Sequence, residues 1–229
     1  MTVAVDFERA RFNMIEQQIR PWDVLDLEVL ELLSLVRRED FVPLAHKALA
    51  FADMQIPLLG ASENVLQHGH CMLEPRVEAR MLQDLRVQPH ESVLEVGAGS
   101  GYMAALLAKR AKRVVSLELH PELIRLARVN LQHAGIGNAE VRQADGAQGL
   151  PSEAPFDVIV LSGSVAEVPP ALLAQLKVGG RLSAIVGFEP VMRATFITRT
   201  GEASYTTTQP WDTLAPRLLN FPEPSRFNF

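Results

Sequence analysis

The chain has 229 residues, of which 48% are hydrophobic and 21% are charged, and its formal net charge is −5. These values are typical of a folded globular protein with a sizeable core, and the negative charge argues against a surface that binds nucleic acid. A single cysteine excludes an internal disulfide framework, and no apolar run reaches the ~18 residues of a membrane span. We therefore expect a cytoplasmic protein that binds neither nucleic acid nor a membrane.

The N-terminal part of the chain indicates helices and an irregular segment. Apolar side chains recur at helical spacing in residues 6–20, a helix that Pro21 should end, and again in residues 24–38. Residues 43–75 contain too many prolines and glycines for long elements, and another helix is expected after them, to about Leu85. The residues expected to face inward are Phe7, Ala10, Met14 and Ile15 in the first helix and Leu25, Val29, Leu32 and Leu33 in the second.

From Ser92 onward, short apolar runs alternate with helical patterns. This alternation predicts an α/β fold, Rossmann-like, with a doubly wound and mostly parallel seven-stranded sheet. A turn at Thr200-Gly201 should add two antiparallel strands at one edge. We divide the chain into a helical N-terminal cap, residues 1–75, and an α/β core with the antiparallel strands, residues 76–229. The expected strands are 92–96, 113–119, 139–144, 156–162, 180–187, 191–200 and 203–209, with helices at 101–110, 121–134 and 168–176.

The stretch "VLEVGAGSGY", residues 93–102, follows a predicted strand and begins a helix. Its glycines permit a tight turn and a close approach of the backbone to a ligand, and the start of the helix offers unpaired N–H groups. Glu118 ends the second strand, 21 residues after Gly97, where an acid meets ribose hydroxyls in nucleotide-binding folds. Asp145 follows the third strand at the same edge and could accept a hydrogen bond from an adenine amino group. Together these features predict a nucleotide-type cofactor site.

The spacing of the loop narrows the choice of cofactor. A dinucleotide fingerprint is G-x-G-x-x-G/A, and its third small residue permits close packing of the helix on the strand. Here Tyr102 occupies that position, and an acid, Glu95, precedes the loop. This arrangement suits S-adenosylmethionine, which has no pyrophosphate and carries a cationic amino group and a sulfonium. The alternative is an oxidoreductase, which tight NADH binding without binding of the methyl donor would favour.

The chain resembles the protein-L-isoaspartate O-methyltransferase family over about residues 25–190. The resemblance implies a class I methyltransferase fold and S-adenosylmethionine-dependent methylation of isoaspartyl carboxylates in proteins or peptides, which is a repair reaction. The segments that carry it are "RREDFVP" (37–43), "AFADMQIPL" (50–58), "VLEVGAGSGYMAALLA" (93–108) and "APFDVIVLSGSVAEVPPALLAQLKVGGRL" (154–182). The cofactor-binding positions that it implies are Glu95, Gly97, Ala98, Gly99, Glu118, Asp145 and Gly146.

The implied acceptor site departs from the family pattern. Where the family reads G-Q-T-I-S-Q-P, this chain has "GHCMLEP", residues 69–75. Leu73 therefore stands at the serine whose hydroxyl helps to hold the acceptor carboxylate, Cys71 stands at the threonine, and Glu74 precedes the proline. A leucine offers no hydrogen-bond donor, and burying a carboxylate without one is costly. The family's C-terminal V-P-L segment, which cradles the substrate, is only echoed in residues 214–224.

Three interpretations of "HGHCMLEPRV", residues 68–77, stay open. His68, His70 and Cys71 are of metal-ligand type, but a zinc site needs three or four ligands with longer spacing, so we expect no metal. A pocket rebuilt for a hydroxyl or amine acceptor would need a base, which Glu74 or His70 could supply. Alternatively the segment is structural, and the protein binds the cofactor without catalysis and acts through a partner.

Overall fold

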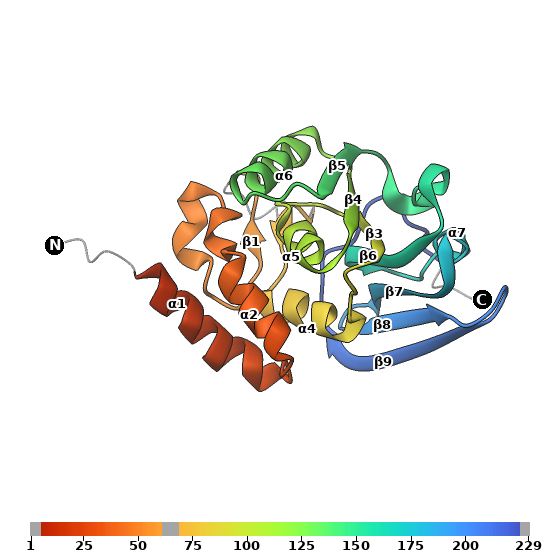
Figure 1. Cartoon of the computed structure of the whole chain (residues 1–229), viewed down its shortest axis with the longest axis horizontal. Helices are drawn as coiled ribbons and strands as arrows, with labels where there is room; N and C mark the ends of the chain where they lie inside the picture. The colour runs from red at the N-terminus through yellow and green to blue at the C-terminus, as the bar shows by residue number, and fades with distance from the viewer. Residues whose placement is uncertain (1–5, 61–68, 225–229) are drawn as a thin grey trace.

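A computed structural model describes residues 6–60 and 69–224 and has at its centre a sheet in the order β5-β4-β3-β6-β7-β8-β9 (Figure 1). The first five strands in that order are parallel, whereas β8 and β9 form an antiparallel hairpin around Thr200-Gly201, as predicted. A separate short pair consists of β1 (Ile56–Pro57) and β2 (Cys71–Met72). The sheet strands are β3 (Ser92–Val96), β4 (Arg113–Glu118), β5 (Ala139–Gln143), β6 (Phe156–Val165), β7 (Leu176–Phe188), β8 (Val191–Arg199) and β9 (Tyr205–Thr213).

Helices cover the sheet, and the N-terminal helices α1 and α2 lie beside it, at the left in Figure 1. None of the helices in the described ranges is long and apolar enough to cross a membrane. The α-helices are α1 (Phe7–Met14), α2 (Leu27–Leu35), α4 (Pro75–Leu85), α5 (Tyr102–Arg110), α6 (Pro121–His133) and α7 (Pro170–Leu173). A π-helical turn spans Ile15–Ile19, and 3-10 turns span Arg20–Trp22, Arg38–Asp40, Leu44–Leu49, Gly146–Gln148 and Pro151–Glu153.

The structure differs from the sequence-based expectation at several points. Leu25 is 65% exposed, so the prediction that it faces inward is wrong. The side chain of Asp26 accepts a hydrogen bond from the Glu28 N–H and caps α2, so Leu25 lies outside the helix. The helix expected over residues 168–176 is reduced to the single turn of α7, because β7 begins earlier than predicted.

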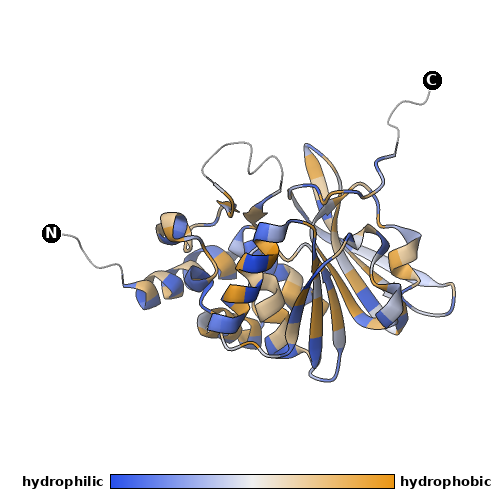
Figure 2. Ribbon diagram, turned by 90° about the horizontal axis from the view of Figure 1, so that it is seen from above, coloured by the Kyte–Doolittle hydropathy of each residue, from blue (hydrophilic) through white to orange (hydrophobic). Residues whose placement is uncertain are grey.

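The sheet separates two hydrophobic clusters, because successive side chains of a strand point to opposite faces. On one face Val93, Val114 and Val158 pack with helices α1, α2, α4, α5 and α6. On the other face Leu94 and Val115 pack with α7 and with part of the C-terminal segment. The strands in the middle of the sheet are accordingly largely hydrophobic, whereas the helices alternate between hydrophobic and hydrophilic residues (Figure 2).

The N-terminal region joins the core in two ways. Helix α2 packs against α4 and α5 on one face of the sheet. The β1–β2 pair instead lies against the loop that follows β3, since a Cβ placed on Gly99 would be 3.4 Å from Leu58 Cδ1. The part of this region near the carboxyl ends of the strands is therefore β1–β2 rather than α1 or α2. The division of the chain at residue 75 stays a prediction.

Candidate cofactor and acceptor site

A cavity lies at the carboxyl ends of β3, β4, β5 and β6, where open parallel sheets bind their ligands. Its lining includes Gly97, Gly99, Glu118 and Gly146, which come from three separate segments of the core. Cys71, the first residue of β2, also lines the cavity and comes from the N-terminal region of the chain. The structure therefore brings together most of the positions that the sequence marks for a cofactor, with the acceptor segment beside them.

The glycine loop has the backbone conformation that its sequence predicts. Gly97 and Gly99 have φ angles of 93° and 53°, in the left-handed region that favours glycine. The Gly97 N–H donates to the Leu117 carbonyl at 2.9 Å, and the Ala98 N–H donates to the same oxygen at 3.3 Å. These bonds tie the loop to the end of β4. Ala98 is buried and lines a second, smaller cavity beneath the loop rather than the main one.

Glu118 joins the loop to the main cavity. One carboxylate oxygen accepts a hydrogen bond from the Gly99 N–H at 3.0 Å. The other accepts from the N–H groups of Leu119 and His120 at 2.8 and 3.0 Å. A carboxylate has about four lone-pair positions, so the Glu118 side chain has room for a further donor such as a ribose hydroxyl.

Glu95 lies under the loop and does not line the main cavity. Its side chain is fully buried, and its two oxygens accept hydrogen bonds from the hydroxyls of Ser116 at 2.6 Å and Ser162 at 2.8 Å. Burial raises the pKa of Glu95 to about 7, against the lowering effect of these two bonds. A buried acid held only by neutral groups fits beneath a cationic ligand.

Asp145 and Gly146 have different positions although they are adjacent. Asp145 is exposed, and its carboxylate accepts hydrogen bonds from the Ala147 N–H at 3.0 Å and from Asn220 Nδ2 at 2.8 Å. Gly146 lines the cavity, and a Cβ there would be 2.2 Å from a methyl carbon of Val96. Asp145 does not line the main cavity, and its expected contact with an adenine amino group stays a prediction.

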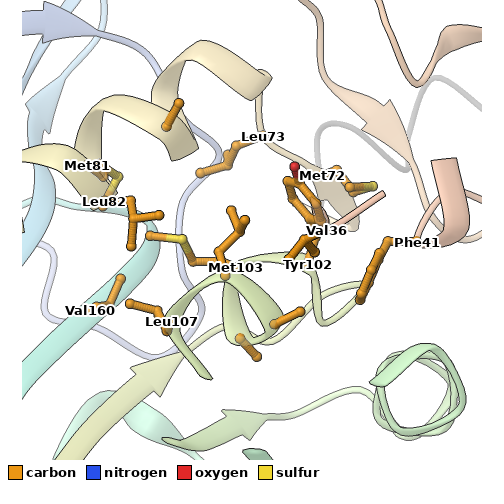
Figure 3. Close-up of a cluster of buried hydrophobic side chains, with 14 of the residues drawn as sticks. Val36, Phe41, Met72, Leu73, Met81, Leu82, Tyr102, Met103, Leu107 and Val160 are labelled. Atoms are coloured by element: carbon orange, nitrogen blue, oxygen red, sulfur yellow. The ribbon is translucent and has the colours of Figure 1, made fainter. Parts of the chain in front are cut away.

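Leu73 points into the hydrophobic interior beside Tyr102 and Met103 (Figure 3). It is 6% exposed and lines the smaller cavity together with two buried acids, Glu78 and Glu95. The two cavities share lining residues at Cys71 and in the glycine loop, so they are neighbours. The place that the family resemblance gives to a hydroxyl is thus occupied by an alkyl group.

A buried ion pair supports this segment. Arg38 is fully buried, contacts the Glu78 carboxylate and donates from Nη2 to the Leu73 carbonyl at 2.6 Å. Burial raises the pKa of Glu78, and Arg38 opposes that rise. The ion pair was not foreseen from the sequence. The only local signal was Arg38 within "RREDFVP", which gives no hint of a partner on another helix.

The other two acceptor positions have limited reactivity. Burial raises the pKa of Cys71 to about 12, so the thiol stays protonated at neutral pH. Its sulfur lies 3.7 Å from Gln55 Oε1, to which it donates. Burial also raises the pKa of Glu74, whose carboxylate accepts a long hydrogen bond of 3.4 Å from Gln55 Nε2. Glu74 is the better candidate of the two for moving a proton.

Two histidines that line the main cavity, His70 and His120, contact each other through their rings. The rings of His70 and His120 are 4.8 Å apart, edge to face. Within residues 6–60 and 69–224, no group of three or more histidine, cysteine, aspartate or glutamate side chains is arranged to hold a metal ion. His68, the third residue of ligand type in this stretch, lies outside the described residues.

Residues 217–219 and Phe221 complete the cavity and were missed as cofactor-site residues in the sequence. The sequence related this segment only to substrate binding, through a weak echo of the family's V-P-L motif. Ser162, which holds Glu95, was missed as well. Its position at the end of a predicted strand, at the ligand-binding edge of the sheet, could have indicated it.

Comparison with known proteins agrees with the fold. The family model described as Protein-L-isoaspartate(D-aspartate) O-methyltransferase matches residues 9–212. The protein-L-isoaspartate O-methyltransferase of Koribacter versatilis is 39% identical over 193 residues, which cover 84% of this chain and 83% of that protein. Protein-L-isoaspartate O-methyltransferase 1 of Syntrophobacter fumaroxidans is 42% identical over 183 residues, with coverages of 80% and 82%.

Two solved structures share the fold. One, a protein-L-isoaspartate O-methyltransferase, aligns with a TM-score of 0.75 at 23% identity, covering 91% of this chain and 65% of that chain. The other, from Plasmodium falciparum and in complex with S-adenosyl-L-homocysteine, aligns with a TM-score of 0.75 at 17% identity, with coverages of 93% and 98%. At these identities the two structures establish the architecture alone.

Proposed function

We propose that this chain, which belongs to the protein-L-isoaspartate O-methyltransferase family, transfers a methyl group from S-adenosylmethionine to isoaspartyl carboxylates. Its substrates would be damaged proteins or peptides that carry such residues. The observation that carries the proposal is that Gly97, Gly99 and Glu118 line the same cavity as Cys71 of the acceptor segment. The lone cysteine suits a reducing compartment, and we infer a cytoplasmic location.

The residues around the cavity fit a donor with a positively charged methionine part and a ribose. Glu118 at the end of β4 has lone pairs for ribose hydroxyls, and Glu95 supplies a buried carboxyl group beneath the loop, whose charged form a cationic ligand would stabilise. When bound, the donor supplies an electrophilic methyl group on its sulfonium. A carboxylate acceptor is already an anion, so no residue has to remove a proton, and the task of the protein is to hold the acceptor in line with the methyl group.

The acceptor side supports a qualified form of this activity. Leu73 lacks the hydroxyl that the family uses to hold the acceptor carboxylate, so we infer weak turnover on isoaspartyl peptides. A second candidate is methyl transfer to a hydroxyl or amine, for which Glu74, with its raised pKa, would serve as the base. A third is cofactor binding without catalysis, through a partner. Residues 1–75 would supply the substrate side in the two catalytic cases.

An assay of methyl transfer to an isoaspartyl peptide, with the native chain and with Leu73→Ser, tests the function. We expect slow turnover by the native chain and faster turnover by the variant, because serine restores a donor for the carboxylate. Leu73→Ala is the matched control, since it makes space without adding a donor. Fast native turnover would contradict the role given to Leu73. Silence in all three chains, with cofactor binding intact, would favour another acceptor or none.

Glu118→Ala is expected to weaken binding of S-adenosylhomocysteine by about 1–3 kcal/mol, because a hydrogen bond to a charged group is lost. Calorimetric titration measures the change. Glu122→Ala, an exposed acid at the start of α6, is the control and should leave the affinity unchanged. Equal affinities for the native chain and Glu118→Ala would mean that the ribose is held elsewhere.

A further inference from the structure

The segment after β9, residues 216–224, crosses the carboxyl ends of the strands, and we call it the strap. The Ser164 N–H donates to the Pro216 carbonyl at 2.7 Å, and the Leu218 N–H donates to the Ser164 carbonyl at 2.8 Å. The guanidinium of Arg217 donates to a carbonyl at the end of β7 at 3.0 Å. The strap is therefore held against β6 and β7 by backbone and side-chain bonds.

Leu218 fixes the strap over the glycine loop. A Cβ on Gly97 would be 3.0 Å from Leu218 Cδ2, and a Cβ on Gly163 would be 2.8 Å from the same atom. Leu218 therefore fills the space that side chains at these two positions would need. At the other side of the cavity, a Cβ on Gly69 would be 3.3 Å from Pro216 Cβ. The strap thus contacts both the loop and the acceptor segment.

The distal part of the strap reaches the end of β5. Asn220 has a positive φ of 65°, which asparagine tolerates, and donates from Nδ2 to Asp145 at 2.8 Å. Phe221 follows it, is 7% exposed, lines the cavity and belongs to the same hydrophobic cluster as Ala144. The strap therefore runs from the glycine loop to the segment that follows the third parallel strand, where Asn220 bonds Asp145.

We propose that the strap is a wall of the methyl-donor site, in which Phe221 contacts the adenosine part of the donor and Asn220 is a positioning residue that holds Asp145 and the strap together. The inference rests on the proposed binding of S-adenosylmethionine. It differs from the family resemblance, which gives this segment to the acceptor. The reason is that Phe221 lines the main cavity with Ala144 and Gly146, whereas Leu73 lines the small cavity and belongs to the other of the two hydrophobic clusters.

The expected effect is on the time that the donor or product stays bound. With the strap in place, a ligand in the cavity is enclosed between the glycine loop and the side chains of Leu218 and Phe221. Loss of a hydrogen bond to the charged Asp145 should raise the dissociation rate on the order of tenfold. Loss of an aromatic contact with the adenine should raise it by a similar factor.

The test measures the dissociation rate of labelled S-adenosylhomocysteine from the full chain, in the presence of excess unlabelled ligand and without acceptor. Asn220→Ala and Phe221→Ala should each dissociate roughly tenfold faster than the native chain. Leu214→Ala is the matched control, because Leu214 is 44% exposed, precedes the strap and does not line the cavity. The melting temperature without ligand is measured for every chain, and Phe221→Leu replaces Phe221→Ala where the latter fails to fold.

Two results would overturn the inference. One is an unchanged dissociation rate in folded Asn220→Ala and in whichever folded variant replaces Phe221. The other is a raised KM for an acceptor peptide with donor kinetics unchanged, which would return the strap to the acceptor side. Failure of the proposed function looks different, because the native chain itself would then bind no S-adenosylhomocysteine. Binding without peptide methylation leaves the inference about the strap standing.

Discussion

Replacing Arg38 with methionine is expected to lower the free energy of unfolding by about 3–5 kcal/mol, because it leaves a buried charge without its partner. Arg38 is fully buried between Glu78 and the Leu73 carbonyl. Without the guanidinium, Glu78 must either keep an unpaired buried charge or take up a proton, and the Leu73 carbonyl loses its donor. Urea unfolding of the native and variant chains, compared at their midpoints, measures the loss.

A double variant, Arg38→Met with Glu78→Leu, is the control. It replaces both charges by apolar groups and should recover much of the lost stability. The single variant should also become less stable as the pH rises. Burial raises the folded pKa of Glu78, so the folded state binds a proton that the unfolded chain releases, and removing Arg38 extends that pH range upward. A loss below about 1 kcal/mol at every pH would contradict the buried pair.

The strands of the core and their mostly parallel arrangement could be predicted because the signals for them are local. Each apolar run from Ser92 onward is bounded by charged residues, proline or glycine, and crossover helices leave few arrangements for parallel strands. The end of β6 could not be predicted from such local signals. A strand was expected over residues 156–162, yet β6 continues to Val165. Ser164 is held there by the strap, more than 50 residues further along the chain.

In the candidate site, too, the residues with local sequence signals could be predicted and those placed by non-local contacts could not. Gly97, Gly99 and Glu118 lie where their spacing predicts, since they lie at or just after the ends of two parallel strands, and the carboxyl ends of parallel strands meet at one edge. The partner of Arg38 lies 40 residues away on α4 and leaves no periodic signal. Neither does Phe221, which reaches the cavity only after the chain has completed the antiparallel hairpin. Non-local contacts of this kind require the fold.

Glu95 should link proton binding to stability and to donor binding. It is fully buried, and the two groups that bond its carboxylate are the neutral hydroxyls of Ser116 and Ser162. Its pKa is about 7 in the folded protein and 4.5 when exposed. The folded state therefore keeps a proton that the unfolded state releases. The resulting stabilisation is complete below pH 4.5 and is lost as the pH rises through 7, by about 3 kcal/mol in total.

Replacing Glu95 with glutamine should remove this dependence, because glutamine has the same shape and carries no charge. Its amide can exchange hydrogen bonds with both serine hydroxyls, which rotate to accept as well as donate. In urea unfolding without ligand, the variant should match the native chain near pH 5 and be more stable by about 2–3 kcal/mol near pH 8. In titrations near pH 8, it should bind S-adenosylmethionine more weakly, and the loss should be smaller for S-adenosylhomocysteine, which lacks the sulfonium charge. A variant less stable than the native chain near pH 8 would mean that a group inside the protein already balances the charge of Glu95, and the carboxylate would then have no need of a cationic ligand.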